Sequence, residues 1–578
     1  MRIGLLTEGG YPYVSGDARL WCDRLVRGLG QHEFDIYALS RSERQEVEGW
    51  LELPPQVSRV RTAPLWTAED DGVTLGRRAR RRFGECYEEL AAVLCEGDGQ
   101  ASTEGAPCER GASSADVADR FANALYGLAE LARDEGGLVA ALRSESAVRA
   151  LERACRAPGA LRTARGARVP ELLTVAAQLE RALRPLSLDW YEDDALGSVD
   201  LCHATAGGTA ALPGLLARHF AGVPLLVTEY GVQLRTHYLA SADAPPAVRA
   251  LLSAFHGRLA AEIYRRATLI TPGNSHTRRW QERCGADRTK LRTVYPGMEA
   301  SRFAEVGEAP DGADPDTLVW VGRVEPAKDL ISLLHAFAEI RKDEPKARLR
   351  IVGAPAGAEG AAYLGHCRAL AAQLFPDEAE GVHAVGDNPV SFEEIGGPEA
   401  PTLAEAYAAG TVIVLSSVVE GFPLSLVEAM FCGRATVSTD VGAVVEVIGG
   451  TGLVVPPRNP RALAEACVSL LRDPERRERL GAAARARALE LFTVEQNIAA
   501  FHSIYLEIVS HSPVRRVVLD EAGDPLPFAA PAEAHVLGRW TGPMTRVVAR
   551  GGPTWATGAP VRATPPTALP LPTTEAAR

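Results

Sequence analysis

The alternation of short apolar runs with helical patterns constrains this fold most, and it occurs twice along the chain. Apolar runs stand at residues 2–7, 34–39, 223–228 and 267–272, with a weaker one, SVDLCHAT, at 198–205. From about residue 317 the rhythm restarts with TLVWVGRV, ARLRIVG, VHAVGD, GTVIVLSS and RATVSTDVG, again separated by helical patterns. Strands that alternate with helices are typical of a parallel sheet covered on both faces. The sequence therefore predicts two doubly wound, Rossmann-like α/β units.

Regions of different composition divide the 578 residues. Residues 67–190 interrupt the first unit with helical patterns such as LRSESAVRALERACRA, so we expect a helical insertion, in which EGDGQASTEGAPCERGASS forms a mobile loop. The first unit is then expected over 1–312 and the second over 313–491. FTVEQNIAAFHSIYLEIV predicts an amphipathic helix at 492–510 that packs back on the first unit. The tail at 535–578, rich in Pro, Thr and Ala, is expected to be disordered.

Composition excludes several classes of protein. A net charge of -12 argues against a general nucleic-acid binder, which needs a basic surface to grip phosphates. The basic run GRRARRRF at 77–84 is expected to be a solvated helix face, with contact to anionic lipid or RNA as the alternative. The start MRIGLLTEGG has too short an apolar run for a signal peptide, and no stretch approaches the roughly 18 apolar residues of a membrane span. We therefore expect a cytoplasmic protein without a transmembrane segment.

The ten cysteines are scattered along the chain without any C-x-x-C pair. Most stand in apolar patterns, as Cys202 and Cys432 do. We therefore expect reduced, buried thiols rather than disulfides or zinc ligands.

The stretch VVEGFPLSLVEAM at 418–430 carries two glutamates eight positions apart. Gly and Pro oppose a helix through 420–423, so Glu420 is expected on a loop and Glu428 about one turn into a short helix that ends at Gly433. The backbone N–H groups that collect where a strand, a loop and a helix N-terminus meet favour the binding of an anion. The alternative for Glu428 is a capping box with Ser425, which would leave Glu420 unexplained.

A pair of cations follows the strand TLVWVG. Arg323 stands directly after Gly322, and Lys328 follows five residues later. An arginine fork and a lysine point charge at a strand end suit a diphosphate. The alternative is a surface salt bridge to Glu325 or Asp329.

The chain carries a glycine-containing first turn, a histidine after a mid-domain strand, the Gly-Arg…Lys motif and then the two glutamates. In this order the motifs resemble those of the GT-B retaining glycosyltransferases of family four. The chain looks more narrowly like the PelF-like subgroup, from TEGGYPYVSGDARLW, DLCHATAGG followed by TEYG, and EGFPLSLVEAM with TDVGAVVEVI downstream. The resemblance covers roughly residues 1–66 and 190–510. It implies a GT-B fold, in which two Rossmann-like domains face a cleft.

The resemblance also implies roles for residues of the second unit. Arg323 and Lys328 would hold the diphosphate of a sugar-nucleotide donor and stabilise the leaving group. Glu420 would contact hydroxyls of the transferred sugar, and Glu428 would bind the ribose hydroxyls. Backbone amides that face sugar and phosphate would come from the loop Gly421, Phe422, Pro423, Leu424 and Ser425.

In the first unit the resemblance implies that His203 lies beside the reacting carbon, although a packed core histidine is the alternative. Glu229, which follows a strand in TEYG, is expected on the acceptor side, with packing as an equal alternative. Gly16 would let the backbone approach a ligand closely. Relatives often have a second glycine where this chain has Asp17, which we expect to be a helix N-cap, the alternative being contact with acceptor hydroxyls.

The expected reaction is metal-independent transfer of a hexosyl group, with retention, from a UDP-hexose to a saccharide acceptor. No cofactor is expected beyond the nucleotide sugar itself. Exopolysaccharide synthesis and peripheral association with a membrane polysaccharide-export complex are expected from the resemblance. The alternatives are a sugar-nucleotide epimerase and a non-catalytic nucleotide-sugar-binding subunit. The one D-x-D, Asp314-Pro315-Asp316, lies in a polar linker and is interpreted as a turn rather than a metal site.

Overall fold

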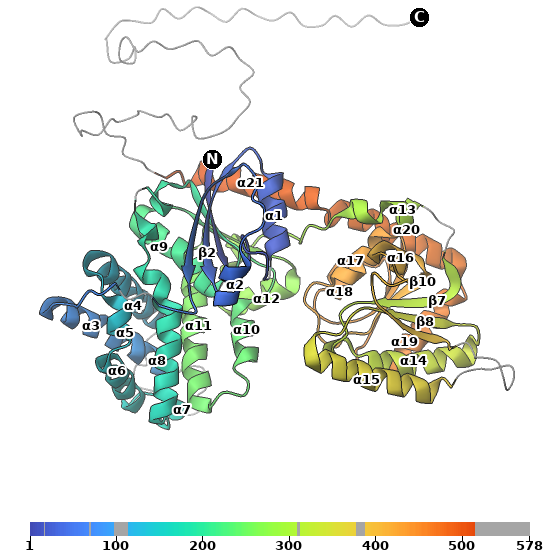
Figure 1. The fold of residues 1–578 in the computed structure, drawn as a ribbon, viewed down its shortest axis with the longest axis horizontal. Coiled ribbons are helices and arrows are strands. Elements are labelled where there is room, and N and C mark those ends of the chain that lie inside the picture. The colour runs from blue at the N-terminus through green and yellow to red at the C-terminus, as the bar shows by residue number, and fades with distance from the viewer. Residues whose placement is uncertain are drawn as a thin grey trace, which may run out of the picture.

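Two parallel sheets form the framework of the protein in the computed structural model (Figure 1). The structure describes residues 1–16, 18–68, 71–96, 114–192, 194–308, 313–376 and 388–514. Within these residues each sheet has six strands, in the orders β3-β2-β1-β4-β5-β6 and β12-β11-β10-β7-β8-β9. In both sheets the first strand of the unit is central, its next two strands lie on one side and its last three on the other. The predicted fold class, two Rossmann-like α/β units, is confirmed.

The first sheet consists of β1 (Arg2–Glu8), β2 (Glu33–Ser40), β3 (Val57–Pro64), β4 (Leu201–Ala204), β5 (Leu225–Glu229) and β6 (Leu269–Pro272). Five of these strands coincide with the predicted apolar runs. The edge strand β3 was not predicted, because two arginines interrupt the apolar residues of its sequence, VSRVRTAP. The strand is only half-buried. Pairing with β2 makes it a strand despite that pattern.

One face of the first sheet carries the insertion. Its helices are α3 (Arg77–Cys95), α4 (Ser114–Glu135), α5 (Leu138–Leu142), α6 (Glu145–Arg156), α7 (Arg162–Arg165) and α8 (Val169–Leu183). They share one apolar core with α9 (Leu212–Ala221), α11 (Pro246–Arg266) and the strands (Figure 1). The loop predicted to be mobile falls almost wholly on residues 97–113, outside the described residues.

The opposite face of the first sheet is covered by α1 (Arg19–Gly28) and by α21 (Val494–His511) from the end of the described chain. Residues of β1 and β2 pack with Phe501, Ile504 and Tyr505 of α21. In Figure 1, α21 runs along the top of the molecule from the second unit back to the first. The helix predicted at 492–510 therefore lies against the first sheet, where it covers a face that would otherwise be exposed. The tail predicted to be disordered, 535–578, lies outside the described residues.

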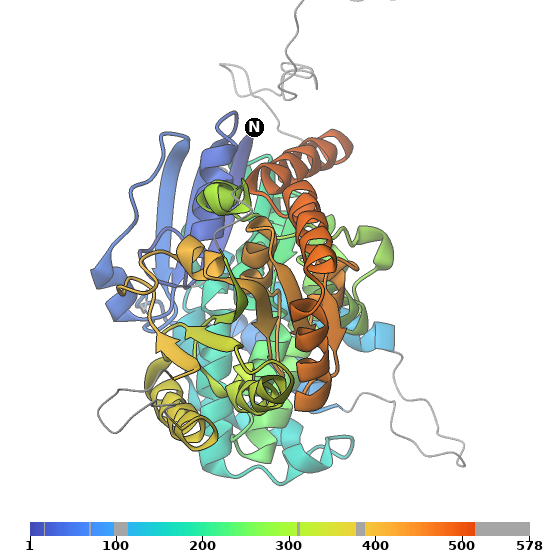
Figure 2. The same ribbon diagram turned by 90° about the vertical axis from the view of Figure 1, so that its right-hand side faces the viewer.

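The second sheet consists of β7 (Asp314–Val321), β8 (Arg348–Val352), β9 (Val390–Glu393), β10 (Gly410–Leu415), β11 (Ala435–Thr439) and β12 (Leu453–Val455). One face packs on α14 (Leu330–Asp343), α15 (Gly357–Leu374) and α19 (Pro460–Leu471), and the other on α17 (Leu424–Phe431) and α20 (Pro474–Leu491). Figure 2 looks onto this unit, with α20 leading into α21. The short strands β9 and β12 were not predicted, and VHAVGD lies outside the described residues.

The remaining α-helices are short connectors or flank the strand ends: α2 (Glu43–Glu48), α10 (Gln233–Ala240), α12 (Ser275–Arg283), α13 (Ala304–Glu308), α16 (Leu403–Ala408) and α18 (Val444–Ile448). Asp314-Pro315-Asp316 is the exposed start of β7 rather than the predicted turn, because Asp314 pairs with Gly410 of β10. Nine cysteines of the described chain are free, and seven of them are buried. Among the described helices, none combines the length and the apolar character that a membrane crossing requires.

Candidate active site at the strand ends

The structure brings Lys328 and Glu420 together at the carboxyl end of the second sheet. Lys328 ends a 3-10 turn that follows β7, and Glu420 lies on the loop that follows β10, as predicted. The Lys328 Nζ atom is 2.6 Å from Glu420 Oε2, and the two side chains are only 15% and 13% exposed. Ser417 Oγ donates to the same carboxylate oxygen at 3.1 Å. The alternative, a surface pair with Glu325 or Asp329, does not form, because Lys328 reaches across to a residue 92 positions away.

Arg323 stands on the same loop, directly after Gly322 at the end of β7. Its side chain is exposed, and it forms no ion pair with any other residue that the structure describes. Lys328 is neutralised by Glu420, whereas the guanidinium of Arg323 carries an uncompensated positive charge. Arg323 therefore offers the five N–H donors of its guanidinium to a ligand at this strand end.

Backbone contacts hold the two loops against each other. Val418 donates its N–H to the carbonyl of Ala327 at 2.9 Å, and Ser416 Oγ donates to the carbonyl of Lys328 at 2.7 Å. On the other side, Thr439 Oγ1 donates to the carbonyl of Ser417 at 2.6 Å. Because strand ends of β7, β10 and β11 all contribute, the positions of Lys328 and Glu420 depend on the whole sheet edge.

The loop after Glu420 leads into α17 as the sequence predicts. Gly421 and Leu424 are exposed, Pro423 is the N-cap residue, and Ser425 is half-buried in the first turn. The ring of Phe422 lies 5.7 Å from that of Phe492 and 6.3 Å from that of Tyr295. This contact fixes the loop to the segments that connect the two units.

Glu428 lies one turn into α17, and the helix ends at Phe431, with Gly433 two residues beyond. The capping box with Ser425 does not form, since α17 has no side-chain cap. Instead, Tyr407 of α16 donates its hydroxyl to Glu428 Oε2 at 2.8 Å. Burial raises the pKa of the Glu428 carboxyl, and the hydrogen bond from Tyr407 opposes that effect only in part. Tyr407 was not identified from the sequence, because nothing in AEAYAAG marks it as a partner of a residue 21 positions away.

A Glu428→Gln substitution should stabilise the protein at pH 7.5. A buried carboxyl with a raised pKa costs stability once the pH rises through that pKa, and a neutral amide removes the cost while its oxygen still accepts from Tyr407. We expect the melting temperature to rise by on the order of 1–2 °C. The gain should vanish toward pH 4, where the wild-type glutamate is itself protonated.

The measurement is thermal unfolding of both proteins across this pH range. The control is Glu490→Gln, a change at an exposed glutamate of α20, which should leave the melting temperature unchanged at every pH. A Glu428→Gln protein that is less stable than wild type at pH 7.5 would contradict the assigned cost of burial.

In the first unit, the backbone conformation requires a glycine at position 16. Its φ is +111°, and a Cβ atom there would lie 1.8 Å from the carbonyl oxygen of Gly9. The glycine therefore allows two segments at the end of β1 to approach each other, which is a different reason from the expected approach of a ligand. Helix α1 begins at Arg19 with Ala18 as its N-cap residue, and Asp17, which was expected to be the N-cap, lies outside the described residues.

His203 is a core residue of β4, which favours the packed-histidine alternative over a place beside a reacting carbon. The side chain is 0% exposed. Its Nδ1 and Nε2 atoms are hydrogen-bonded to Tyr505 Oη and Thr228 Oγ1, each at 2.7 Å. Burial lowers the pKa of the imidazole to about 3, so it is neutral in the folded protein. With no exposed atom and both ring nitrogens occupied, His203 cannot touch a substrate in this conformation.

Glu229 ends β5 and is also buried, at 1% exposed. Its carboxylate accepts hydrogen bonds from Tyr264 Oη at 2.6 Å and Gln281 Nε2 at 2.9 Å. A Cβ atom on Gly207 would lie 2.3 Å from Glu229 Oε1, so the carboxylate packs directly beneath the loop that follows β4. Glu229 therefore positions that loop, and the packing alternative describes it better than direct contact with an acceptor.

Glu446 of α18 joins the carboxyl ends of the two sheets. Its Oε2 accepts from the backbone N–H of Ser275, at the start of α12, at 2.7 Å, and its Oε1 accepts from Tyr295 Oη at 2.9 Å. α18 follows β11 and α12 follows β6, so the contact lies at the ligand-binding edge of both Rossmann-like sheets. The sequence offered no signal for this contact, which depends on how the two units sit together.

No group of three or more His, Cys, Asp or Glu in the described ranges is arranged to hold a metal ion. Besides Glu446, the polar groups near the strand ends of the second sheet include the cations Arg323 and Lys328, the carboxylates of Glu420 and Glu428, and backbone amides. This set can bind a phosphorylated, hydroxyl-rich ligand through charge and hydrogen bonds.

Comparison with known proteins relates both units to other chains. Residues 1–289, half of the chain, match a family model described as Domain of unknown function (DUF3492). The chain belongs to the DUF3492 family. The match spans the first sheet with its insertion, and thus Gly16, His203 and Glu229. Residues 315–473 match the family model Glycosyl transferases group 1, which spans Arg323, Lys328, Glu420 and Glu428.

Curated relatives of this DUF3492 protein carry the name D-inositol 3-phosphate glycosyltransferase. The one from Kineococcus radiotolerans is 34% identical over 225 residues, which cover 35% of this chain and 49% of the relative. The one from Rhodococcus erythropolis is 33% identical over 288 residues, which cover 48% and 61%. The chain spans about half the length of the first curated relatives it matches.

The crystal structure of Anabaena Alr3699/HepE in complex with UDP is 14% identical, covers 87% of this chain and 99% of its own, and has a TM-score of 0.49.

These findings confirm the resemblance to group 1 glycosyltransferases, and the PelF-like subgroup stays a prediction. Besides Tyr407 and Glu446, sequence reasoning missed two further groups at the site. Ser417 immediately precedes the Glu420 loop, and Gly442 follows β11 in TDVGAV. A small residue two or three positions after the end of a buried strand was the available signal for both.

Proposed function

We propose that this DUF3492 protein is a metal-independent, retaining glycosyltransferase that moves a hexosyl group from a nucleotide sugar, a UDP-hexose, to a saccharide acceptor. The observation that carries the proposal is the Lys328–Glu420 ion pair at the carboxyl edge of the second sheet, with the unpaired Arg323 on the same loop. A cation pair suits the diphosphate and a carboxylate suits the sugar hydroxyls. The match of residues 315–473 to group 1 glycosyltransferases supports the same function.

In the proposed reaction the bond between the anomeric carbon and the diphosphate oxygen breaks, and the acceptor oxygen bonds to that carbon on the same face. The acceptor proton goes to the leaving phosphate. Negative charge grows on the diphosphate as the bond breaks, so fixed positive charge at Arg323 and Lys328 lowers the barrier. Glu420 would exchange part of its contact with Lys328 for a sugar hydroxyl, while Ser417 keeps the carboxylate in place. Glu428 would accept from the ribose hydroxyls.

The acceptor would bind at the carboxyl edge of the first sheet, where Glu229 supports the loop that starts at Thr205. We assign His203 no direct role in the chemistry. The saccharide product suggests polysaccharide synthesis, and we place the protein in the cytoplasm, with peripheral association to a membrane polysaccharide-export complex.

The experiment is a thermal-shift screen of UDP, GDP and ADP sugars, followed by product analysis with and without saccharide acceptors. A saturating donor should raise the melting temperature, because a ligand that binds only the folded state stabilises it by a few kcal/mol. Glycosyl transfer only when an acceptor is present would support the proposal. Conversion of the donor sugar without an acceptor would indicate an epimerase instead, and donor binding without any conversion would indicate a binding subunit.

Gly442→Ala should lower transfer by about 100-fold without unfolding the second unit. Gly442 has φ +57°, and an added Cβ would lie 2.1 Å from the carbonyl oxygen of Glu420, so the Glu420 loop must move by almost 1 Å. A displacement of that size at a reacting group can cost about two orders of magnitude in rate. The measurement is kcat with the donor identified in the screen.

The matched control is Gly450→Ala. Gly450 also has a positive φ, +87°, but no atom lies within 4 Å of its added Cβ. It therefore carries the same kind of backbone strain without the clash, and its kcat should stay within about twofold of wild type. Equal losses in the two variants would show that backbone strain, rather than the position of Glu420, explains the effect.

A further inference from the structure

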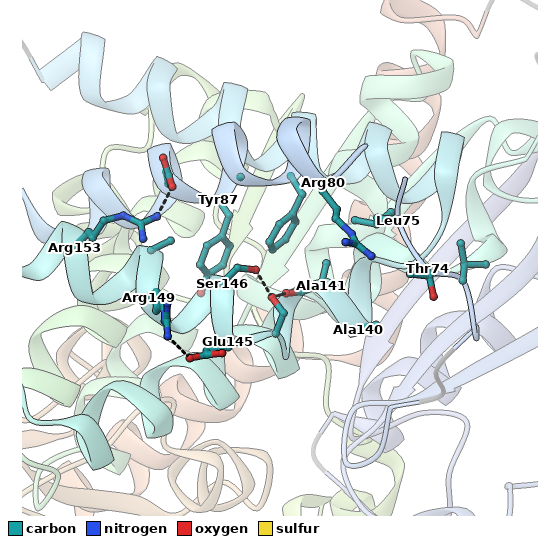
Figure 3. A pocket seen from close by; sticks show the side chains of 17 residues that line it. Thr74, Leu75, Arg80, Tyr87, Ala140, Ala141, Glu145, Ser146, Arg149 and Arg153 are labelled. Atoms are coloured by element: carbon teal, nitrogen blue, oxygen red, sulfur yellow. Dashed lines mark hydrogen bonds and ion pairs between the residues drawn. The ribbon is translucent and has the colours of Figure 1, made fainter. Parts of the chain in front are cut away.

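A cavity of about 640 Å³ lies inside the helical insertion, between α3, α5 and α6 (Figure 3). Its volume falls in the range of small-molecule sites, about 300–1,000 Å³. These helices stand on the side of the first unit that faces away from the second unit (Figure 1). The cavity is therefore separate from the strand ends described above, and ligand binding there does not depend on the proposed transferase activity.

The floor of the cavity is apolar. Leu75 and the stacked rings of Phe83 and Tyr87, whose centroids are 5.4 Å apart, are buried at its base. Small residues leave the space open, namely Gly84, Gly137, Ala140, Ala141 and Ala150. An apolar ligand gains free energy on such a surface, because the ligand's own carbon atoms, and the few that the floor leaves exposed, would be removed from water.

The rim of the cavity is cationic. Arg149 pairs with Glu145 at 2.6 Å, and Arg153 pairs with Glu88, so both carboxylates on the rim are engaged. Arg80 is exposed and forms no ion pair within the described part of the chain. Figure 3 shows the three arginines spread along the cavity, with Tyr87 between Arg153 and Arg80. The rim carries three arginines and two glutamates, so one positive charge, that of Arg80, is uncompensated.

Arg80 belongs to the basic run 77–84, which the sequence predicts to be a solvated helix face. The exposure of the run agrees with that prediction, since Arg77, Arg78, Arg80 and Arg81 are exposed. Arg81 pairs with Glu85 and Arg82 with Glu130, but within the described residues Arg77 and Arg78 form no ion pair. They lie in the first turn of α3, close to Arg80, and make the electrostatic potential on that side of the cavity more positive.

We propose that this cavity binds an anionic amphiphile, with its apolar body on Leu75, Phe83 and Tyr87 and its phosphate or carboxylate on Arg80. A saccharide fits less well, since the two serine hydroxyls in the wall already bond within the protein. Ser144 Oγ donates to the carbonyl of Ala141 at 2.6 Å and lies 2.7 Å from Ser146 Oγ. Sugar hydroxyls on the apolar floor would lose their bonds to water without replacement. A cation is disfavoured by the unpaired Arg80.

The test uses the full chain and dodecyl phosphate, titrated by calorimetry below its micelle concentration. We expect one site per chain, and at least tenfold weaker binding of dodecyl maltoside, which has the same chain and a neutral head. Gly84→Leu should abolish binding, because a Cβ on Gly84 meets no atom within 4 Å and the leucine would fill the cavity. Arg80→Ala should weaken binding roughly tenfold, the value of one charge-assisted hydrogen bond.

Matched variants separate these effects from damage to the fold. Gly257→Leu changes a glycine of α11 that also has open space around its Cβ but does not line the cavity. Arg479→Ala changes an exposed arginine of α20. Both should bind dodecyl phosphate like wild type. Undiminished binding by Gly84→Leu, or equal affinity for the neutral amphiphile, would overturn the proposal.

A second arm identifies the source of the amphiphile. Sedimentation with vesicles of phosphatidylcholine, with and without phosphatidylglycerol, asks whether a lipid in a bilayer can occupy the site. Binding to the anionic vesicles that Gly84→Leu abolishes would indicate a membrane lipid. Binding of dodecyl phosphate without vesicle binding would indicate a soluble amphiphile. Failure of dodecyl phosphate to bind the wild-type chain at all would refute the site whatever the source.

Discussion

Replacing Arg323 by alanine should lower transfer from the nucleotide sugar by about 100- to 1,000-fold, the loss typical when one fixed donor to a developing negative charge is removed. The side chain is exposed and makes no ion pair with the described residues, so the fold does not depend on it. We therefore expect the melting temperature to stay within about 1 °C of wild type. Initial rates and thermal unfolding of the same preparation test both statements.

Arg323 is a cleaner test than Lys328. Lys328→Ala would leave the Glu420 carboxylate, only 13% exposed, without its cation, so stability and rate would fall together. Arg479→Ala, at an exposed arginine of the same unit, is the control and should not change the rate. An Arg323→Ala protein with a rate within threefold of wild type would show that the diphosphate does not bind at this strand end.

Replacing His203 by alanine should destabilise the first unit by about 3 kcal/mol or more, while the protein that still folds keeps its rate within about threefold. The substitution leaves Tyr505 Oη and Thr228 Oγ1 without their partner and opens a cavity between Trp21 and Phe501. Each unsatisfied buried group costs about 1–3 kcal/mol, and the cavity adds to that cost. Denaturant unfolding and the rate per folded molecule measure the two effects separately.

The pH dependence of this loss has a definite sign. The folded pKa of His203 is lowered to about 3, below the ordinary value near 6.5, so the stability that it contributes is complete above 6.5 and declines as the pH falls toward 3. The difference between wild type and His203→Ala should therefore be larger at pH 7.5 than at pH 4.5. The stability of His203→Gln, which can keep one of the two hydrogen bonds, should lie between that of wild type and that of His203→Ala. A loss of rate above 100-fold in a fully folded variant would instead restore a catalytic role.

Much of the framework follows from local pattern. The predicted apolar runs that lie within the described residues became strands, and Gly421, Pro423 and Gly433 predicted where the loop after β10 ends and where α17 stops. These features depend on neighbours a few positions away, because strand and helix periods and the conformations of Gly and Pro are properties of short segments. Edge strand β3 was missed for the same reason. Its alternating arginines resemble no apolar run, and only its pairing with β2 makes it a strand.

The sequence by itself therefore determined the two α/β units, the loop position of Glu420 and the helical position of Glu428. Only the tertiary structure decided that Lys328 pairs with Glu420 rather than with a nearby acid, that Tyr407 holds Glu428, and that His203 is enclosed by a helix 302 residues further along the chain. The physical reason is that burial and ion pairing depend on which surfaces the folded chain brings together. The residue type at a position states what chemistry is available there, and the packing of distant segments determines whether water, a ligand or the protein itself uses it.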